Sequence, residues 1–162
     1  MNKGSHGRND RLIQEKRHDT YRERGKLSEN TVCTGCRALY VNGRWCWKKV
    51  PRTATEAVCP ACQRIADKYP AGFVEIKGDF LKGHEEEIFN LIRNVEAAEK
   101  GEHPLERIMA MTDEDGRTLV TTTGVHIARR IGEALSRSYN GDYSFQYADA
   151  EKIIRVSWER SA

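Results

Sequence analysis

The sequence of 162 residues lacks the features that mark membrane and secreted proteins. No apolar run approaches the length of about 18 residues that crosses a bilayer, so we expect no transmembrane helix. A secretory signal would carry an apolar stretch behind its basic residues, and the N-terminus has none. Acidic residues interrupt the first 25 positions, which is not typical of a transit peptide. We therefore expect a cytoplasmic protein with no membrane partner.

Apolar residues are also scarce, at 38% of the chain against 31% charged, with a mean hydropathy of −0.72. These apolar residues are too few to form a hydrophobic core along the whole chain. We therefore expect part of the chain to be a tail or a metal-stabilised module. The net charge of +3 is unevenly distributed. Residues 1–64 carry 14 Lys and Arg and 6 Asp and Glu, a net +8, whereas residues 65–162 carry 13 and 18, a net −5. This polarity indicates a basic end that meets a polyanion and an acidic body.

Composition divides the chain into three predicted segments. Residues 1–30 are polar and basic, and too poor in aliphatic side chains to form a core, so they are predicted to be a flexible or helical arm. Such an arm is either a solvated tail or a segment that orders on nucleic acid. Residues 31–70 hold all five cysteines, and residues 71–162 show regular helix and strand periodicity.

The cysteine spacing predicts a metal site. Cys33-x-x-Cys36 is followed, after 22 intervening residues, by Cys59-x-x-Cys62. Paired thiols in a reducing compartment indicate metal ligands, and four thiolates suit one structural Zn²⁺. We predict a zinc ribbon with a hairpin that turns at Asn42 and Gly43. A redox dithiol pair and an iron–sulfur cluster are the alternatives. The remaining Cys46 is expected to be a small buried side chain or, alternatively, an exchanging ligand or regulatory thiol.

Basic and aromatic residues surround these cysteines. Lysine and arginine neutralise phosphates, and indole rings offer surfaces on which bases stack. The predicted RNA-binding residues are Arg11, Lys16, Arg17, Tyr21, Arg22, Arg24, Lys26, Arg37, Arg44, Trp45, Trp47, Lys48, Lys49, Arg52 and Arg64. The alternative is that the tryptophans fill the ribbon core while the cations are merely solvated. A possible second surface comprises His126, Arg129 and Arg130, which otherwise belong to an ordinary solvated helix face.

Residues 71–162 predict an α+β domain. Strands are expected at 73–77, 108–111, 118–122, 143–147 and 153–158, with one helix beginning at the glutamates 85–87 and another running from about 123 to 140. The order is β-α-β-β-α-β with one extra strand, which favours a ferredoxin-like split βαβ arrangement. The sequence has no phosphate-binding glycine loop, nucleophile elbow or His-Glu-x-x-His motif. We therefore expect a monomeric protein that is not an enzyme and has no small-molecule substrate.

Two stretches together resemble a known family. The knuckles Cys33-Thr-Gly-Cys36 and Cys59-Pro-Ala-Cys62 precede a βα unit, and residues 121–135 read Thr-Thr-Thr-Gly-Val-His-Ile-Ala-Arg-Arg-Ile-Gly-Glu-Ala-Leu. They resemble the zinc-bearing N-terminal region of the archaeal and eukaryotic adaptor that escorts the large ribosomal subunit during export. The chain is also similar to a family of small bacterial proteins with the same ribbon-plus-α/β layout. The likeness spans about residues 31–150 and includes none of the adaptor's further domains.

This resemblance implies binding to ribosomal RNA rather than a role in export. For a small bacterial protein it suggests a stress-linked, hibernation-type or assembly factor that occupies a functional site on the ribosome. Two alternatives remain open. One is a DNA-binding transcriptional regulator that uses the same ribbon. The other is an enzyme subunit or metal-handling protein in which Cys46 or His84 exchanges metal.

Overall fold

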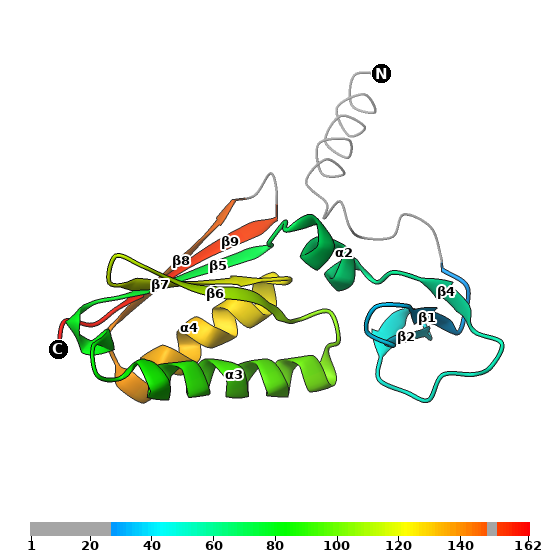
Figure 1. Ribbon diagram of the computed structural model, residues 1–162, viewed down its shortest axis with the longest axis horizontal. Helices are drawn as coiled ribbons and strands as arrows, with labels where there is room; N and C mark the ends of the chain where they lie inside the picture. Colours follow the sequence, from blue (N-terminus) through cyan, green and yellow to red (C-terminus); the bar gives the residue numbers. More distant parts are fainter. Residues whose placement is uncertain (1–26, 149–151) are drawn as a thin grey trace, which may run out of the picture.

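The computed structural model describes residues 27–148 and 152–162, and Figure 1 shows two sheets side by side along the long axis. A small sheet carries the first cysteine pair, and a larger sheet is covered by helices. Helix α2 (Pro60–Asp67) lies between them. The predicted arm, including the helix that its sequence allows, lies outside the described residues.

The small sheet is built from short strands in the order β3-β2-β1-β4. These are β1 (Thr31–Cys33), β2 (Leu39–Val41), β3 (Arg44–Cys46) and β4 (Thr55–Ala57). The predicted hairpin is confirmed, because β2 and β3 pair antiparallel around Asn42 and Gly43, whose φ angles of 55° and 82° suit a tight turn of the type favoured between strands. Strand β4 returns parallel to β1 and so brings the second cysteine pair beside the first.

Helix α2 begins at the second cysteine pair and is not predicted by the sequence patterns described above. Cys59 is its N-cap, Pro60 occupies the first turn, and Lys68 ends it in the left-handed conformation with φ 55°. Proline suits a first turn because its missing N–H has no intrahelical partner there. The chain then enters the larger sheet.

The larger sheet has the strand order β6-β7-β5-β9-β8. Its elements are β5 (Gly72–Lys77), the short 3₁₀ helix η1 (Asp79–Leu81), α3 (Glu85–Glu102), β6 (Ile108–Glu114), β7 (Arg117–Thr122), α4 (Val125–Tyr139), β8 (Asp142–Ala148) and β9 (Ile153–Glu159). Every strand and helix predicted from periodicity in this region is present, with ends that differ by a few residues. The α+β class is therefore confirmed.

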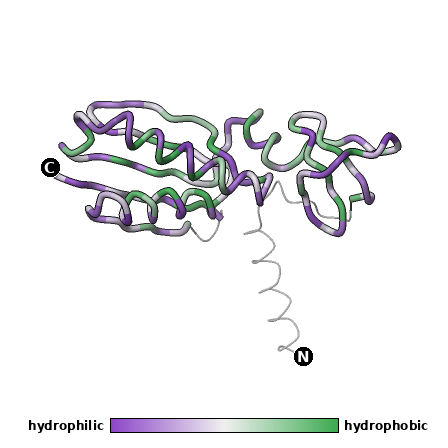
Figure 2. The backbone as a smooth tube through the Cα atoms, turned by 90° about the horizontal axis from the view of Figure 1, so that it is seen from below, coloured by the Kyte–Doolittle hydropathy of each residue, from purple (hydrophilic) through white to green (hydrophobic). Residues whose placement is uncertain are grey.

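The core lies between this sheet and helices α3 and α4, which cover one of its faces (Figure 1). Alternate residues of β5 and β9, among them Val74, Ile76 and Trp158, are fully buried against that helical layer. Figure 2 shows hydrophobic and hydrophilic positions alternating along the helices, as expected for elements with one apolar face. Gly132 lets α4 approach closely, because a Cβ there would lie 2.4 Å from the Tyr143 ring.

The complete ferredoxin-like layout is not confirmed. One split βαβ unit is present. Helix α3 connects β5 to β6, and β7 lies between these two strands in the sheet. A ferredoxin-like sheet would place the strand that follows the second helix directly beside β5. That place is taken instead by β9, which is parallel to β5, and β8 lies at the sheet edge. The extra strand thus enters the sheet interior because the β8–β9 hairpin pairs through its second strand.

Candidate metal centre

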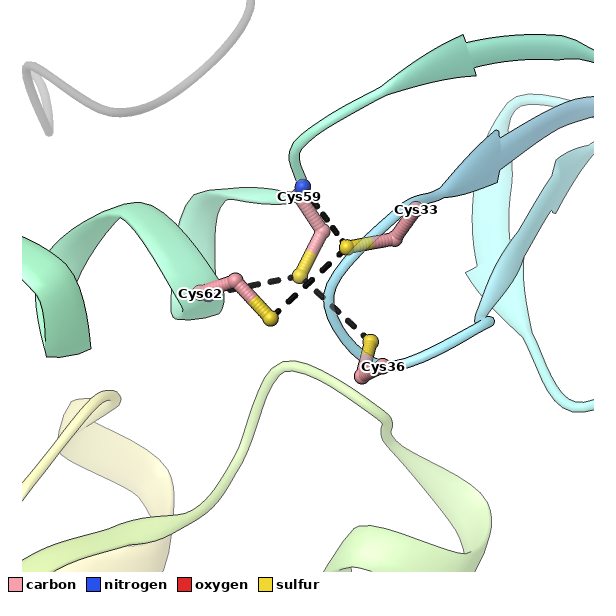
Figure 3. A group of neighbouring side chains, drawn as sticks. All are labelled: Cys33, Cys36, Cys59 and Cys62. Carbon is pink, nitrogen blue, oxygen red and sulfur yellow. Dashed lines mark hydrogen bonds between the residues drawn. The ribbon is translucent and has the colours of Figure 1, made fainter.

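The four predicted ligands converge at the junction of the small sheet and α2 (Figure 3). Cys33 ends β1 and Cys36 follows on a turn, while Cys59 caps α2 and Cys62 lies in its first turn. Their sulfur atoms all lie within 4.8 Å of one another. The turn requires Gly35, since a Cβ at that position would lie 2.9 Å from the Cys62 sulfur.

The spacing of the sulfurs fits a tetrahedral zinc site. Cys33 Sγ lies 3.7 Å from Cys62 Sγ, and Cys36 Sγ lies 3.8 Å from Cys59 Sγ. A Zn–S bond of about 2.3 Å places the corners of a regular tetrahedron about 3.8 Å apart. These distances and the all-sulfur donor set suit Zn²⁺ held by four thiolates.

Backbone N–H groups orient the sulfurs. Cys33 Sγ accepts from the N–H of Gly35 at 3.3 Å and from that of Cys59 at 3.2 Å, and Cys59 Sγ accepts from the N–H of Cys62 at 3.4 Å. Burial raises the pKa of Cys33, but backbone hydrogen bonds outweigh burial and lower it to about 6. Burial raises the pKa of Cys59 and of Cys62. Cys33 is therefore more readily available as a thiolate for metal binding than Cys59 or Cys62.

A buried arginine from the larger domain completes the centre. Arg107, 6% exposed, donates through Nη2 to Cys36 Sγ at 3.0 Å and to Cys59 Sγ at 3.4 Å, and through Nη1 to Cys62 Sγ at 3.3 Å. Burial lowers the pKa of Arg107, but the hydrogen bond to Cys62 and the nearby sulfur charges outweigh burial and raise the pKa above its usual value. The guanidinium therefore stays cationic. The sequence interpretation missed this residue, because it lies 45 residues beyond the last cysteine of the cluster and no local spacing marks it.

The predicted RNA-binding residues divide into four groups. Five cations of the ribbon are exposed, namely Arg37, Arg44, Lys48, Lys49 and Arg52. Trp45 is 9% exposed and packs edge-on against Tyr40 in the ribbon core, so its alternative interpretation as a core residue holds. Arg64 is also buried, and its guanidinium donates to the Tyr69 carbonyl at 2.9 Å, so the structure does not place it on the ribbon surface.

Trp47 is partly exposed, but its indole N–H is committed to the Lys100 carbonyl at 2.6 Å, which ties the ribbon to the end of α3. The remaining predicted contacts lie outside the described residues, namely Arg11, Lys16, Arg17, Tyr21, Arg22, Arg24 and Lys26.

The possible second surface is occupied largely by ion pairs within the domain. His126 Nε2 lies 3.2 Å from Glu99 Oε1, and Arg130 Nε lies 3.5 Å from the other oxygen of the same carboxylate. Arg129 lies 3.5 Å from Glu133 and stacks over the Phe145 ring. These contacts support the alternative interpretation of a solvated helix face.

The two other residues considered for metal exchange have local partners. Cys46 is half-buried, lies outside the four-sulfur cluster and donates to the Leu39 carbonyl at 3.4 Å. His84 precedes α3, stacks on the Phe80 ring with centroids 3.9 Å apart, and its Nδ1 lies 2.8 Å from the Phe80 carbonyl.

Comparisons with known proteins find no matching family model, no matching curated protein and no matching solved structure. The resemblance to the export adaptor therefore stays a prediction. Within the described residues, no helix is both long and apolar enough to span a bilayer.

Proposed function

We propose that this chain is a non-enzymatic zinc-binding protein that binds ribosomal RNA through its ribbon. The observation that carries the proposal is the set of exposed cations on the turns of the zinc ribbon. Arg37 follows the first knuckle, Arg44 begins β3, and Lys48, Lys49 and Arg52 lie on the loop between β3 and β4. Exposed lysine and arginine side chains neutralise the phosphates of nucleic acids.

The metal centre supports a structural rather than a catalytic zinc. Four sulfur ligands leave Zn²⁺ no open coordination position for water or substrate. The zinc would hold the two knuckles together, and so would shape the loops that carry the cations. On this proposal the protein acts by occupancy, as a stress-linked, hibernation-type or assembly factor that covers a functional site on the ribosome. The choice of ribosomal RNA rests on the family resemblance, and the choice of a polyanion rests on the ribbon charge.

Sedimentation through sucrose gradients tests the proposal. We expect tagged protein to travel with ribosomal fractions at low salt and to leave them at high salt, because counterion release makes phosphate contacts salt-dependent. Absence from every ribosomal fraction at low salt would falsify the proposal.

A pair of charge variants localises the interaction. The double change Lys48→Ala and Lys49→Ala removes two exposed cations of the ribbon, and Lys82→Ala with Arg93→Ala removes two exposed cations of the larger domain. We expect the ribbon variant to bind more weakly, with a log–log salt slope smaller by about 0.7–0.9 for each phosphate that it no longer neutralises. The control pair should keep the wild-type slope, and equal weakening in both would argue against the ribbon as the binding surface.

A DNA-binding regulator remains the second candidate, because the same exposed cations neutralise DNA phosphates equally well. Cross-linking the protein in cells and sequencing the bound nucleic acid separates the two. Enrichment of ribosomal RNA supports the first proposal, and enrichment of DNA without ribosomal RNA supports the regulator.

A further inference from the structure

The zinc ribbon and the larger domain meet in a seam, and three of the described side chains that contribute to it are Trp47, Leu105 and Arg107. Trp47 donates its indole N–H to the Lys100 carbonyl, and Leu105 packs against the buried cluster of the ribbon. Arg107 is the third, and it reaches three of the four cysteine sulfurs. Of the three side chains, Arg107 is the one that touches the metal ligands themselves.

Arg107 is held rigidly from the side of the larger domain. Its Nε donates to the Pro104 carbonyl at 2.7 Å, which fixes the plane of the guanidinium. Its backbone N–H donates to Thr123 Oγ1 at 2.8 Å, and its carbonyl accepts from the Thr123 N–H at 2.9 Å. Thr123 precedes α4, so the guanidinium is anchored to the framework that packs the core of the larger domain.

The burial of this guanidinium demands an anionic partner. A buried cation is costly unless it is paired and hydrogen-bonded. Four thiolates on one Zn²⁺ carry a net charge of −2, and the guanidinium fork shares its N–H groups among three of those sulfurs. Hydrogen bonds to sulfur also fix the orientation of metal ligands, as outer-shell partners do in other metal sites.

We propose that Arg107 joins zinc loading and the docking of the ribbon onto the larger domain into one event. From the larger domain, its guanidinium holds the sulfurs of Cys36, Cys59 and Cys62 in the geometry that the metal needs, and so slows metal release. In return, the zinc-held sulfurs accept the hydrogen bonds of the buried guanidinium and so hold the ribbon against the larger domain. Arg107 is thus a positioning residue, and the inference does not depend on the identity of the nucleic acid.

Zinc-release kinetics test the first half of the proposal. Zinc-loaded full-length protein is mixed with a chromogenic chelator, and the release rate is compared among wild type, Arg107→Met, Arg107→Lys and Arg160→Met. Arg160 is a matched control because it is a partly buried arginine of the larger domain that donates to the Tyr139 carbonyl and stacks over Phe80, away from the sulfurs. We expect Arg107→Met to release zinc about 10- to 100-fold faster. Arg107→Lys should be intermediate, and Arg160→Met should match wild type.

Indole N–H signals in ¹⁵N NMR spectra test the second half. Trp47 reports on the seam, and Trp158, whose indole donates to the Asn140 carbonyl at 2.6 Å, reports on the core of the larger domain. We expect the Trp47 signal to shift toward its solvent-exposed position when zinc is removed from wild type, and also in zinc-loaded Arg107→Met. The Trp158 signal should stay in place in both.

The same Trp158 signal shows whether a variant is folded. If Arg107→Met loses it, Arg107→Lys decides the question, because a lysine keeps the positive charge but lacks the planar fork that spans the sulfurs while Nε donates to the Pro104 carbonyl. Wild-type zinc release from every folded Arg107 variant would overturn the proposal. An unchanged Trp47 signal in zinc-free wild-type protein would overturn it equally.

Discussion

Arg107 Nη2 donates to Cys36 Sγ at 3.0 Å across a separation of 71 residues. The hydrogen bond joins the residue immediately before β6 to the first cysteine knuckle, and it makes the candidate metal centre common to both parts of the molecule. The larger domain nevertheless keeps its own buried core of aliphatic residues and Trp158. The two parts should therefore respond differently to loss of the metal.

Replacing one ligand should unfold the ribbon and spare the larger domain. We expect Cys59→Ser to lose bound zinc, because structural zinc contributes on the order of 10 kcal/mol or more to small zinc modules. Cys46→Ser is the matched control, since that thiol lies outside the cluster, and it should keep one zinc per chain. Elemental analysis gives the zinc content, and the Trp158 indole signal reports on the core. Loss of zinc from both variants would contradict the assigned ligand set.

Two helix glycines should respond in opposite directions to alanine. A Cβ at Gly132 of α4 would lie 2.4 Å from Tyr143 and 2.7 Å from Val156, whereas one at Gly101 of α3 meets nothing within 4 Å. We expect Gly132→Ala to lower the free energy of unfolding by about 1–3 kcal/mol through overpacking. Gly101→Ala should raise it by up to about 1 kcal/mol, because alanine is the better helix former. Chemical denaturation measures both, and a stabilised Gly132→Ala would show that α4 is not tightly packed on β8 and β9.

Glu106 should make stability depend on pH. Its Oε1 accepts from the Ile127 N–H at 2.8 Å near the start of α4, and burial raises its pKa despite that hydrogen bond. A raised pKa means that the folded state binds the proton more tightly, so the stabilisation present below the ordinary glutamate pKa is lost as pH rises through the raised value. Glutamine has no such proton to lose.

As pH rises from about 4 to about 8, the free energy of unfolding of wild type should therefore fall relative to that of Glu106→Gln. Comparing two proteins with the same metal site cancels the effect of pH on zinc binding. Denaturation curves at a series of pH values give the difference, and two parallel profiles would show that Glu106 does not titrate in this range.

Local patterns predicted much of the fold. The alternation in β5 and the apolar spacing of Ile127, Ile131 and Leu135 predicted the strand and helix that they form, because these periods follow directly from strand and helix geometry. The Asn42-Gly43 turn was recognisable because few residues adopt two successive positive φ angles. Strand order was not predictable in this way. The insertion of β9 beside β5 depends on which edge of the β8–β9 hairpin meets the sheet, and either strand offers that edge.

The sequence by itself determined which four cysteines form the cluster, and it separated a basic segment that carries them from an acidic α+β segment. Thiol pairs on tight turns bring sulfurs together locally, and charge composition is read without knowing the fold. Only the tertiary structure decided that Trp45 and Arg64 are buried, that Trp47 is tied to α3, and that Arg107 completes the metal centre. These relationships join residues far apart in the chain, and their cause is the packing of the ribbon against the larger domain. No periodic pattern in the sequence marks such packing.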